Sequence, residues 1–263
     1  IRRENPGQKL MIMFDIDGTI LDMRHAIVHV LRAYDKEKRT EIFRDLRPQD
    51  IQVHEADIER MLDEADLHPE EKERVLDWYV RNFWAPGSII EAHRPFSGVM
   101  EVIRWFQLQP DTYIGLNTGR PESIRAETLK SLNDIGDEYK VLFRDELLFM
   151  NAQGSEKVIA SKIEGLRYFQ AAGFRLFAFV DNEPENLYAV SEVDATGKIL
   201  LLHAETIFRS KRKIPPENFT SGSRYDIAHF LDGRSLPRHI QFVWHGIDTR
   251  EKLDRFLSSN ITW

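Results

Sequence analysis

One short stretch near the start of the chain, residues 10–21 (LMIMFDIDGTIL), most strongly limits what the protein can fold into. Its first five residues are apolar, a run too short for a core helix and typical of a strand in a parallel sheet covered on both faces. Asp15 and Asp17 follow directly, and Gly18 then favours a turn. Two carboxylates at the edge of a core cost free energy unless a cation neutralises them, and the alternative is a solvated acidic turn. The stretch therefore predicts a buried strand that ends at a cation site, and Mg2+ suits it because Mg2+ accepts carboxylate and carbonyl oxygens.

Length and composition narrow the class of protein. The chain has 263 residues, of which 42% are hydrophobic, and a mean hydropathy of -0.43. These values fit one large α/β domain or a core domain with a smaller companion. No apolar run approaches the eighteen residues that indicate a membrane span, so we expect no membrane association of that kind. Because the sequence has no Cys, disulfides and thiolate chemistry are excluded. This leaves the compartment open, and we take a cytoplasmic location as the default expectation.

The charge distribution argues against a nucleic-acid partner. The formal net charge is -7, and residues 50–77 contain eleven acidic side chains against three basic ones. An acidic surface of this kind repels a polyanion, although a solvated helix surface explains the same pattern. We therefore expect a small molecule as the partner of any functional site.

The order of predicted elements gives the fold class. Helical periodicity without any strand signal runs through residues 22–94, which predicts an all-helical insert. After it, short apolar strands alternate with helices, and Pro121 is expected to open one of these helices. The predicted strands lie at residues 113–116, 147–150, 176–180 and 199–202. This alternation predicts a Rossmann-like, doubly wound parallel sheet with its ligand site at the carboxyl ends of the strands.

The expected domain boundaries follow from this order. Residues 1–21 and 95–263 would form the α/β core, and residues 22–94 the small helical domain. Within the core, residues 206–263 are an extension whose place in the fold the sequence leaves open. A strand at 240–244 and a helix at 249–257 are expected inside it.

The polar residues at the predicted strand ends resemble the signature motifs of the haloacid dehalogenase superfamily. The resemblance rests on residues 15–19 (DIDGT), on Thr118, on a lysine ahead of the next apolar strand, and on Asp181 at that strand's end. It covers residues 9–203, and the helical insert stands where that superfamily carries its cap. The resemblance implies a phosphatase with a helical cap inserted after the first motif, and Mg2+ as its cofactor.

The chemistry of the first motif can be argued beside the resemblance. A carboxylate that attacks phosphorus forms an acyl phosphate, and this divides one difficult hydrolysis into two easier displacements. We expect Asp15 to be this nucleophile and Asp17 to be the general acid and base, an effect worth about 10²–10⁴-fold in rate. The resemblance also implies that Asp15 and Asp181 bind the metal through their carboxylates and Asp17 through its main-chain carbonyl.

The second motif would bind the phosphoryl group. Thr118 can donate a hydroxyl hydrogen bond, and Gly119 allows close approach of the main chain. The helix expected after Pro121 would add its positive N-terminal end, whereas a simple turn at 117–119 is the alternative. For the phosphate-binding cation, Lys162 fits the resemblance better than Lys157, which also remains open.

The motif around Asp181 departs from the commoner pattern of the superfamily. Asn182 stands where many members have a second Asp, and it could hold a metal-bound water. Glu185 could support Asp181 or orient Lys162 from the second layer of the site. Glu183 and Glu185 are equally explained as acids at a helix start.

Substrate contacts are less well defined by the sequence. Arg120, Arg24 and His25 lie next to the motifs and are the expected substrate-binding residues, and His54, Trp84 and Arg94 are weaker candidates. The sequence thus predicts a Mg2+-dependent phosphomonoester hydrolase that acts through an aspartyl phosphate on a small phosphorylated metabolite. The alternatives are a phosphomutase of the same superfamily and a non-catalytic phosphate-binding or regulatory module.

Overall fold

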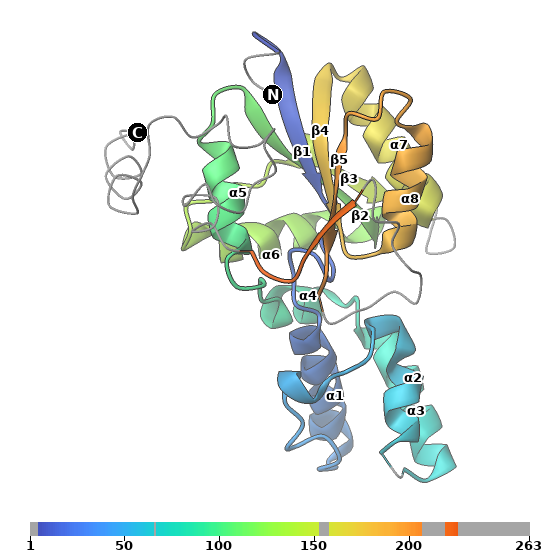
Figure 1. The fold of residues 1–263 in the computed structure, drawn as a ribbon. Helices are drawn as coiled ribbons and strands as arrows, with labels where there is room; N and C mark the ends of the chain where they lie inside the picture. Colours follow the sequence, from blue (N-terminus) through green and yellow to red (C-terminus); the bar gives the residue numbers. More distant parts are fainter. Residues whose placement is uncertain (1–4, 66, 153–157, 207–218, 226–263) are drawn as a thin grey trace.

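The core of the protein is a parallel β-sheet with helices on both faces. A computed structural model describes residues 5–65, 67–152, 158–206 and 219–225 of the chain. Within them the sheet has six strands in the order β3-β2-β1-β4-β5-β6, and every neighbouring pair is parallel (Figure 1). The strands are β1 (Lys9–Phe14), β2 (Thr112–Pro121), β3 (Leu148–Asn151), β4 (Phe174–Asp181), β5 (Leu200–Ala204) and β6 (Phe219–Gly222). This order confirms the predicted doubly wound fold class, because the direction of winding reverses between β1 and β4.

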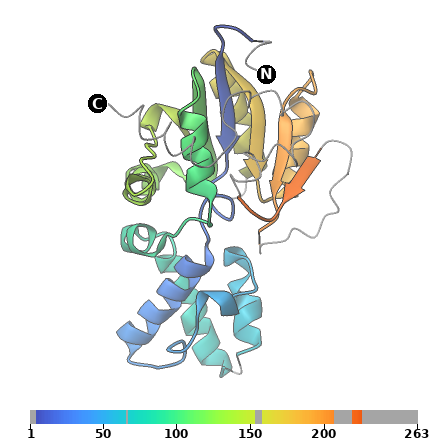
Figure 2. The same cartoon turned by 60° about the vertical axis from the view of Figure 1, so that its left-hand side comes forward.

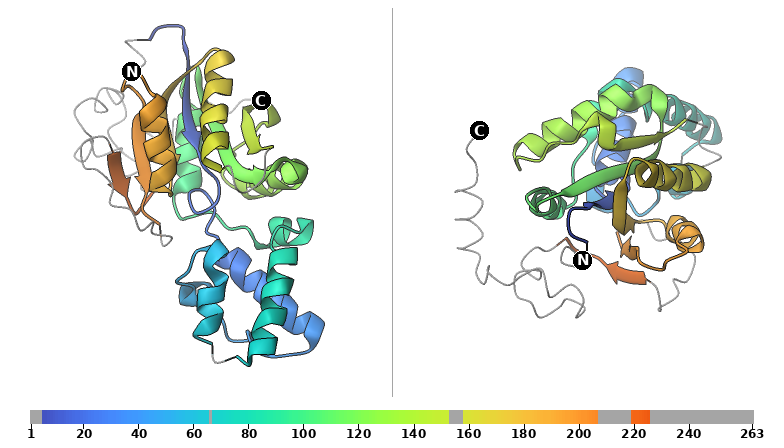
Figure 3. Two further views of the ribbon diagram at one scale, coloured as in Figure 1. Left: turned by 90° about the vertical axis from the view of Figure 1, so that its right-hand side faces the viewer. Right: turned by 90° about the horizontal axis from the view of Figure 1, so that it is seen from above.

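Helices cover the two faces of the sheet, and the alternation of side chains along β1 shows why its whole run is apolar. Ile12 and Phe14 face one buried cluster, and Met11 and Met13 face the other. The first cluster includes residues of α5 (Val99–Gln107) and α6 (Arg125–Asp137), and the second includes residues of α7 (Val158–Ala171) and α8 (Pro184–Val193) (Figure 3). A strand buried on both faces needs apolar residues at every position.

The segment between β1 and α5 is helical, as predicted, and lies beyond the carboxyl ends of the strands (Figures 1 and 2). Its helices are α1 (Arg24–Lys38), α2 (Ile58–Asp63), α3 (Pro69–Asn82) and α4 (Pro86–Ala92), with short 3-10 turns η2 (Pro48–Asp50) and η3 (Glu55–Asp57). The chain enters and leaves this helical insert along paired main-chain segments. Asp22 N donates to the Arg94 carbonyl at 2.8 Å, and Phe96 N donates to the Ile20 carbonyl at 2.9 Å.

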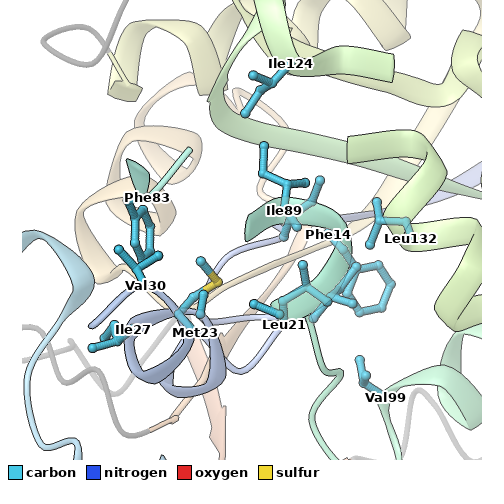
Figure 4. Packing of buried hydrophobic residues seen from close by; sticks show 14 of the residues in the cluster. Phe14, Leu21, Met23, Ile27, Val30, Phe83, Ile89, Val99, Ile124 and Leu132 are labelled. Atoms are coloured by element: carbon cyan, nitrogen blue, oxygen red, sulfur yellow. The ribbon is translucent and has the colours of Figure 1, made fainter. Parts of the chain in front are cut away.

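The helical insert shares one hydrophobic cluster with the sheet. Figure 4 shows side chains of the insert packed against side chains that follow or flank β1 and β2. The labelled residues are Phe14, Leu21, Met23, Ile27, Val30, Phe83, Ile89, Val99, Ile124 and Leu132. All of them are buried, so apolar packing holds the insert to the core. Whether residues 22–94 form a domain of their own stays a prediction.

Two local expectations were wrong, and two others concern residues that the structure does not describe. Pro121 does not open a helix: β2 continues through it, and α6 begins only at Arg125 after the 3-10 turn η4 (Glu122–Ile124). Proline fits the end of a strand because its fixed φ suits extended backbone. Residues 41–45 are turns rather than helix. The strand expected at 240–244 and the helix expected at 249–257 lie outside the described residues.

In the described part of the chain, no helix combines the length and the hydropathy that are needed to cross a bilayer.

Candidate active site

The two predicted metal-binding carboxylates lie at neighbouring strand ends. Asp15 directly follows β1, and Asp181 is the last residue of β4. The two strands are paired up to Phe14 and Val180, and Asp15 N donates to the Val180 carbonyl at 2.9 Å. This is the point at which the sheet reverses its winding, where parallel α/β sheets bind their ligands. The fold therefore brings the first and last motifs together as the sequence predicts.

Lys162 joins the two carboxylates. It projects from α7, its side chain is only 1% exposed, and its ammonium group binds the Asp15 carboxylate. The same Nζ lies 3.0 Å from Asp181 Oδ2 and donates to the Asn117 carbonyl at 2.6 Å. Burial alone would lower the pKa of Lys162, but Asp15 and Asp181 outweigh it and raise the pKa. Lys162 is thus a buried ammonium in the predicted place, while Lys157 lies outside the described residues.

The electrostatics of Asp15 indicate that the site has too little positive charge. Burial raises the pKa of Asp15 to about 7 against the attraction of Lys162, and Asp181 and Asp17 raise it further. The single ammonium group of Lys162 carries one positive charge, whereas Asp15 and Asp181 together carry two negative charges when both are ionised. The guanidinium of Arg120 does not make up the difference, because it is paired with Asp17. A further cation at this point would lower the free energy of the ionised site.

The donor set fits Mg2+. No group of three or more His, Cys, Asp or Glu side chains within the described ranges is arranged to hold a metal ion. Mg2+ does not need such a group, since proteins commonly bind it through one or two carboxylates and leave the other positions to waters and substrate phosphate. Asp15 and Asp181 supply the two carboxylates, and the main-chain carbonyl of Asp17 is the predicted third ligand.

Asn186, rather than Glu185, supports Asp181. Asn186 Nδ2 lies 3.1 Å from both carboxylate oxygens of Asp181, and Glu183 N donates to Asp181 Oδ1 at 2.8 Å. The Glu185 side chain is exposed in the first turn of α8, so the expectation that it supports Asp181 or Lys162 needs correction. The reason is helical geometry: Pro184 starts α8, and this start turns Asn186 inward and Glu185 outward.

Asn182 is bound to the loop that follows β1. Its N–H donates to Thr19 Oγ1 at 3.0 Å, and its Oδ1 accepts from Thr19 Oγ1 at 3.2 Å. Its Nδ2 is buried and has no hydrogen-bond partner in the described part of the chain. Gly18 has a φ of 76°, and a Cβ at this position would lie 2.5 Å from Asn182 Nδ2. Asn182 therefore fixes, from the side of β4, the loop of Gly18 and Thr19 that follows β1.

Arg120 forms a bidentate ion pair with Asp17, so its guanidinium is not free to bind substrate. Its guanidinium donates to both carboxylate oxygens of Asp17, through Nε at 2.7 Å and through Nη2 at 2.6 Å. The Arg120 side chain has no exposed surface, and Nη1 donates to Thr128 Oγ1 at 3.1 Å. The predicted role of Arg120 as a direct substrate contact is therefore corrected. Its bidentate ion pair instead fixes the orientation of the expected acid–base carboxyl.

The far side of Arg120 touches the helical insert. His93 Nε2 accepts from Arg120 Nη2 at 3.2 Å, and the Trp84 ring lies 5.2 Å from the guanidinium carbon. Burial and then the charge of Arg120 lower the pKa of His93 to about 3, so the imidazole is neutral at physiological pH. With Nε2 accepting, His93 Nδ1 carries the proton and donates to Ser131 Oγ, 2.9 Å away. Arg120 thus connects Asp17 to the insert.

The remaining residues of the second motif lie beside β1. Thr118 is buried at the carboxyl end of β2, and its Oγ1 accepts from Arg120 N at 3.2 Å, which leaves its own proton available. Gly119 lies against α7, because a Cβ there would come within 3.1 Å of Val158. Its small size therefore serves the packing of α7 on the sheet.

Arg24 and His25 are directed away from the motif residues. Arg24 Nη2 pairs with Asp22 Oδ2 at 2.5 Å, and His25 lines a separate cleft of about 560 Å³ between α1 and α4, together with Arg94. None of the motif residues lines this cleft. The expectation that these side chains contact the substrate is therefore not met in this arrangement. From sequence, their nearness to the first motif could not show that α1 turns them outward.

Two side chains from a part of the chain that the motifs do not cover contact the loop of Gly18 and Thr19. Thr206 Oγ1 donates to the Gly18 carbonyl at 2.8 Å, and Tyr225 Oη donates to the Thr19 carbonyl at 2.8 Å. The chain around Tyr225 also passes close to Gly98, where a Cβ would lie 1.7 Å from the Tyr225 carbonyl oxygen. No local sequence pattern predicts these two contacts, because they depend on how β5 and β6 form the edge of the sheet.

A second overlooked element is η3 of the helical insert. His54 Nε2 lies 3.7 Å from Glu183 Oε1, and Glu55 is close enough to Asp17 and Arg120 for both charges to affect its pKa. The sequence gives only a weak signal for His54 and none for Glu55, since both stand in an acidic helical segment.

Comparisons with known proteins agree with the fold. No protein-family model matches the sequence, and no curated protein sequence matches it significantly. Among solved structures, similarity extends to a phosphatase-like protein from Clostridium difficile, with 15% identity and a TM-score of 0.54, covering 85% of this chain and 98% of the other. A haloacid dehalogenase-like family hydrolase from Streptococcus pneumoniae has 13% identity and a TM-score of 0.50, covering 84% and 97% of the two chains.

A third similar structure has a different activity in its name. It is protein tyrosine kinase A from Mycobacterium tuberculosis, with 13% identity, a TM-score of 0.50, and coverage of 85% and 98%. Identities this low relate the folds and leave the reaction to be argued from the site itself. The protein therefore has the fold of the haloacid dehalogenase-like hydrolases, as its motifs predict.

Proposed function

We propose that the protein is a Mg2+-dependent phosphomonoester hydrolase that acts on a small phosphorylated metabolite through an aspartyl phosphate at Asp15. The observation that supports this most directly is the Asp15–Lys162–Asp181 arrangement at two neighbouring strand ends, with Asp17 two residues further on. The arrangement joins an expected nucleophile, a phosphate-binding ammonium and a carboxylate pair for a metal ion at the switch point of the sheet.

The reaction would proceed in two displacements. The Asp15 carboxylate attacks phosphorus, an acyl phosphate forms, and the bond from phosphorus to the leaving oxygen breaks. Asp17 gives a proton to that oxygen and later takes one from the water that attacks phosphorus, and the bond between Asp15 and phosphorus then breaks to release inorganic phosphate. Arg120 holds the Asp17 carboxyl through two hydrogen bonds, so its orientation is fixed before the substrate arrives.

The phosphoryl oxygens develop negative charge that positioned donors must balance. The Lys162 ammonium lies next to the expected nucleophile, and the Thr118 hydroxyl retains a proton to donate. Mg2+, held by Asp15, Asp181 and the main-chain carbonyl of Asp17, would supply further neutralisation of the phosphoryl group.

The helical insert would serve as the cap of this site. It lies beyond the strand ends (Figure 1). From it, the side chains of His93 and Trp84 contact Arg120. A lid in this position would exclude bulk water while the acyl phosphate forms. No described residue favours a phosphomutase over a hydrolase, and the retention of all four motifs speaks against a purely regulatory phosphate-binding module.

The test is hydrolysis of a generic aryl phosphate with Mg2+ and with EDTA. We expect turnover that EDTA abolishes and that falls by at least about 10³-fold in Asp15→Asn. Asp145→Asn is the matched control, because Asp145 is an exposed carboxylate that pairs with Arg125 and belongs to none of the motifs. Turnover that persists in Asp15→Asn, or that is insensitive to EDTA, would contradict the mechanism.

A further inference from the structure

The helical insert brings the carboxyl group of Glu55 close to Asp17 and Arg120 of the expected active site. Glu55 is the first residue of η3, and its side chain is 13% exposed. Its Oε2 atom is buried and has no hydrogen-bond partner in the described part of the chain. A buried carboxyl oxygen that lacks a hydrogen bond is destabilising, and more so if it is charged, so this oxygen favours a partner from outside the protein.

The position of Glu55 is fixed by its neighbours. Tyr79 Oη donates to the Glu55 carbonyl at 3.1 Å, which attaches η3 to α3. On the other side, His54 Nδ1 accepts from Ala56 N at 3.1 Å, so in the neutral imidazole Nε2 carries the proton. His54 Nε2 then faces two carboxyls, Glu55 Oε2 at 3.4 Å and Glu183 Oε1 at 3.7 Å. The one N–H proton on His54 Nε2 cannot make a good hydrogen bond to both Glu55 and Glu183.

The cationic side chains near Glu55 are already paired with other carboxylates. Burial and then Asp17 raise the pKa of Glu55 to about 8, and Glu183 adds to the rise while Arg120 opposes it. The two buried cations nearby have partners: Arg120 binds Asp17, and Lys162 binds Asp15 and Asp181. The described residues of the insert that approach this part of the site thus include the Glu55 carboxyl and the His54 imidazole N–H, and Glu183 adds a second carboxyl from the core.

We propose that Glu55 binds the leaving group of the substrate and selects phosphomonoesters whose leaving group ends in a hydrogen-bond donor over those that end in a carboxylate. The inference rests on the proposed function, because it assigns Glu55 to the same active site. A hydroxyl or an ammonium group supplies the hydrogen bond that Oε2 lacks. A carboxylate in the same place would add a further negative charge beside Asp17 and Glu183 and would lose its own hydration.

A matched series of substrates tests this selection. The phosphate esters of ethanolamine, ethylene glycol and glycolate have the same chain length and end in an ammonium, a hydroxyl and a carboxylate. We expect kcat/KM for the first two to exceed that for the glycolate ester by at least about tenfold, because a site built to hydrogen-bond a polar group discriminates strongly against an analogue that cannot pair with it. An aryl phosphate serves as the reference for the chemical step.

Glu55→Gln tests the residue itself. The amide keeps the shape of Glu55, removes the acid and offers an N–H donor, so we expect the preference over the glycolate ester to shrink by at least about tenfold. Glu59→Gln is the control, since Glu59 is an exposed carboxylate of the insert that pairs with Lys72. Equal kcat/KM values for the three esters in the wild type would overturn the inference. So would a Glu55→Gln effect of the same size on all substrates, because that would indicate a structural role.

Binding separates this inference from the proposed function. Calorimetric titration of the three esters into Asp15→Asn measures the preference without turnover, and we expect the same order of affinities. Absence of aryl phosphate hydrolysis by the wild type would contradict the phosphatase function while leaving the binding order as the test of Glu55. Equal affinities of the three esters would contradict the inference whether or not the enzyme hydrolyses them.

Discussion

At the residue scale, the least expected contact is the ion pair between Arg120 and Asp17. The sequence places Arg120 next to the phosphate-binding Thr118 and so points to a substrate contact. In the structure its guanidinium is enclosed by Asp17, Thr128, His93 and Trp84. We interpret Arg120 as a positioning residue that acts on the reaction through Asp17.

This interpretation predicts how Arg120→Lys behaves. Lysine cannot make the bidentate pair, so Asp17 loses its fixed orientation, and we expect kcat for an aryl phosphate to fall by about 10²-fold with little change in KM. Thermal unfolding of the variant checks that it still folds, and Arg94→Lys, at an exposed position, is the control. A large rise in KM with unchanged kcat would show instead that Arg120 contacts the substrate.

Gly18 and Asn182 provide a second prediction at this scale. Gly18→Ala combines a φ of 76° with a Cβ 2.5 Å from Asn182 Nδ2, so we expect a loss of about 1–3 kcal/mol in the free energy of unfolding. The double variant with Asn182→Ala removes the close contact but keeps the backbone strain. Denaturant unfolding should therefore show that the double variant is less destabilised than the sum of the single variants. Strict additivity would mean that the two residues do not meet.

At the element scale, contacts from Thr206, just after β5, and from Tyr225, just after β6, hold the loop that carries the first motif. Tyr225 Oη and Thr206 Oγ1 donate to successive carbonyls of that loop, at Thr19 and Gly18. The loop would otherwise leave these carbonyls to solvent, so the far edge of the sheet contributes to the order of the site.

Tyr225→Phe measures this contribution. It removes one hydrogen bond and little volume, and we expect a loss of about 1 kcal/mol in the free energy of unfolding, read from denaturant titration. Tyr168→Phe is the matched control, because Tyr168 is half exposed on α7. If both variants lose the same amount, the contact at Thr19 contributes nothing specific.

A pH-dependent contact joins α4 to the core. His93 has a folded-state pKa of about 3, against about 6.5 in an unfolded chain, so the unfolded chain binds the proton first. The stabilising effect of neutral His93 is complete above about pH 6.5 and is lost as the pH falls toward 3. Between pH 7.5 and pH 5 linkage gives a loss of about 2 kcal/mol.

His93→Gln removes this titration. The free energy of unfolding of the wild type should therefore fall relative to that of the variant by about 2 kcal/mol over this pH range, measured by denaturant titration at each pH. A difference between the two proteins that does not change with pH would contradict the assignment of a neutral, buried imidazole.

At the scale of the whole molecule, the sheet was predictable because its central strands are buried on both faces and therefore read as short apolar runs. β6 (FTSG) lies at the sheet edge and has no such run, so nothing in its composition marks it as a strand. Asp15, Asp17 and Asp181 were predictable because strand ends in a doubly wound sheet converge.

The partners of these residues were not predictable in the same way. Arg120 and Asp17 stand more than a hundred positions apart, and only the packing of β2 beside β1 makes their side chains meet. Asn186 replaced Glu185 beside Asp181 because the start of α8 sets which side chain faces inward. Glu55 lies close to Asp17 and Arg120 because Tyr79 of α3 holds η3, a contact between two segments of the insert that share no motif.

The central claim is that Asp15 becomes phosphorylated during turnover, and trapping of that intermediate tests it most directly. The enzyme would be mixed with excess aryl phosphate and Mg2+, quenched in acid within one turnover, digested and examined by mass spectrometry. The account predicts one added phosphoryl group on the peptide that contains Asp15, and none in Asp15→Asn. A phosphoryl group on another residue, or hydrolysis without any phosphorylated peptide under conditions that trap acyl phosphates, would contradict it.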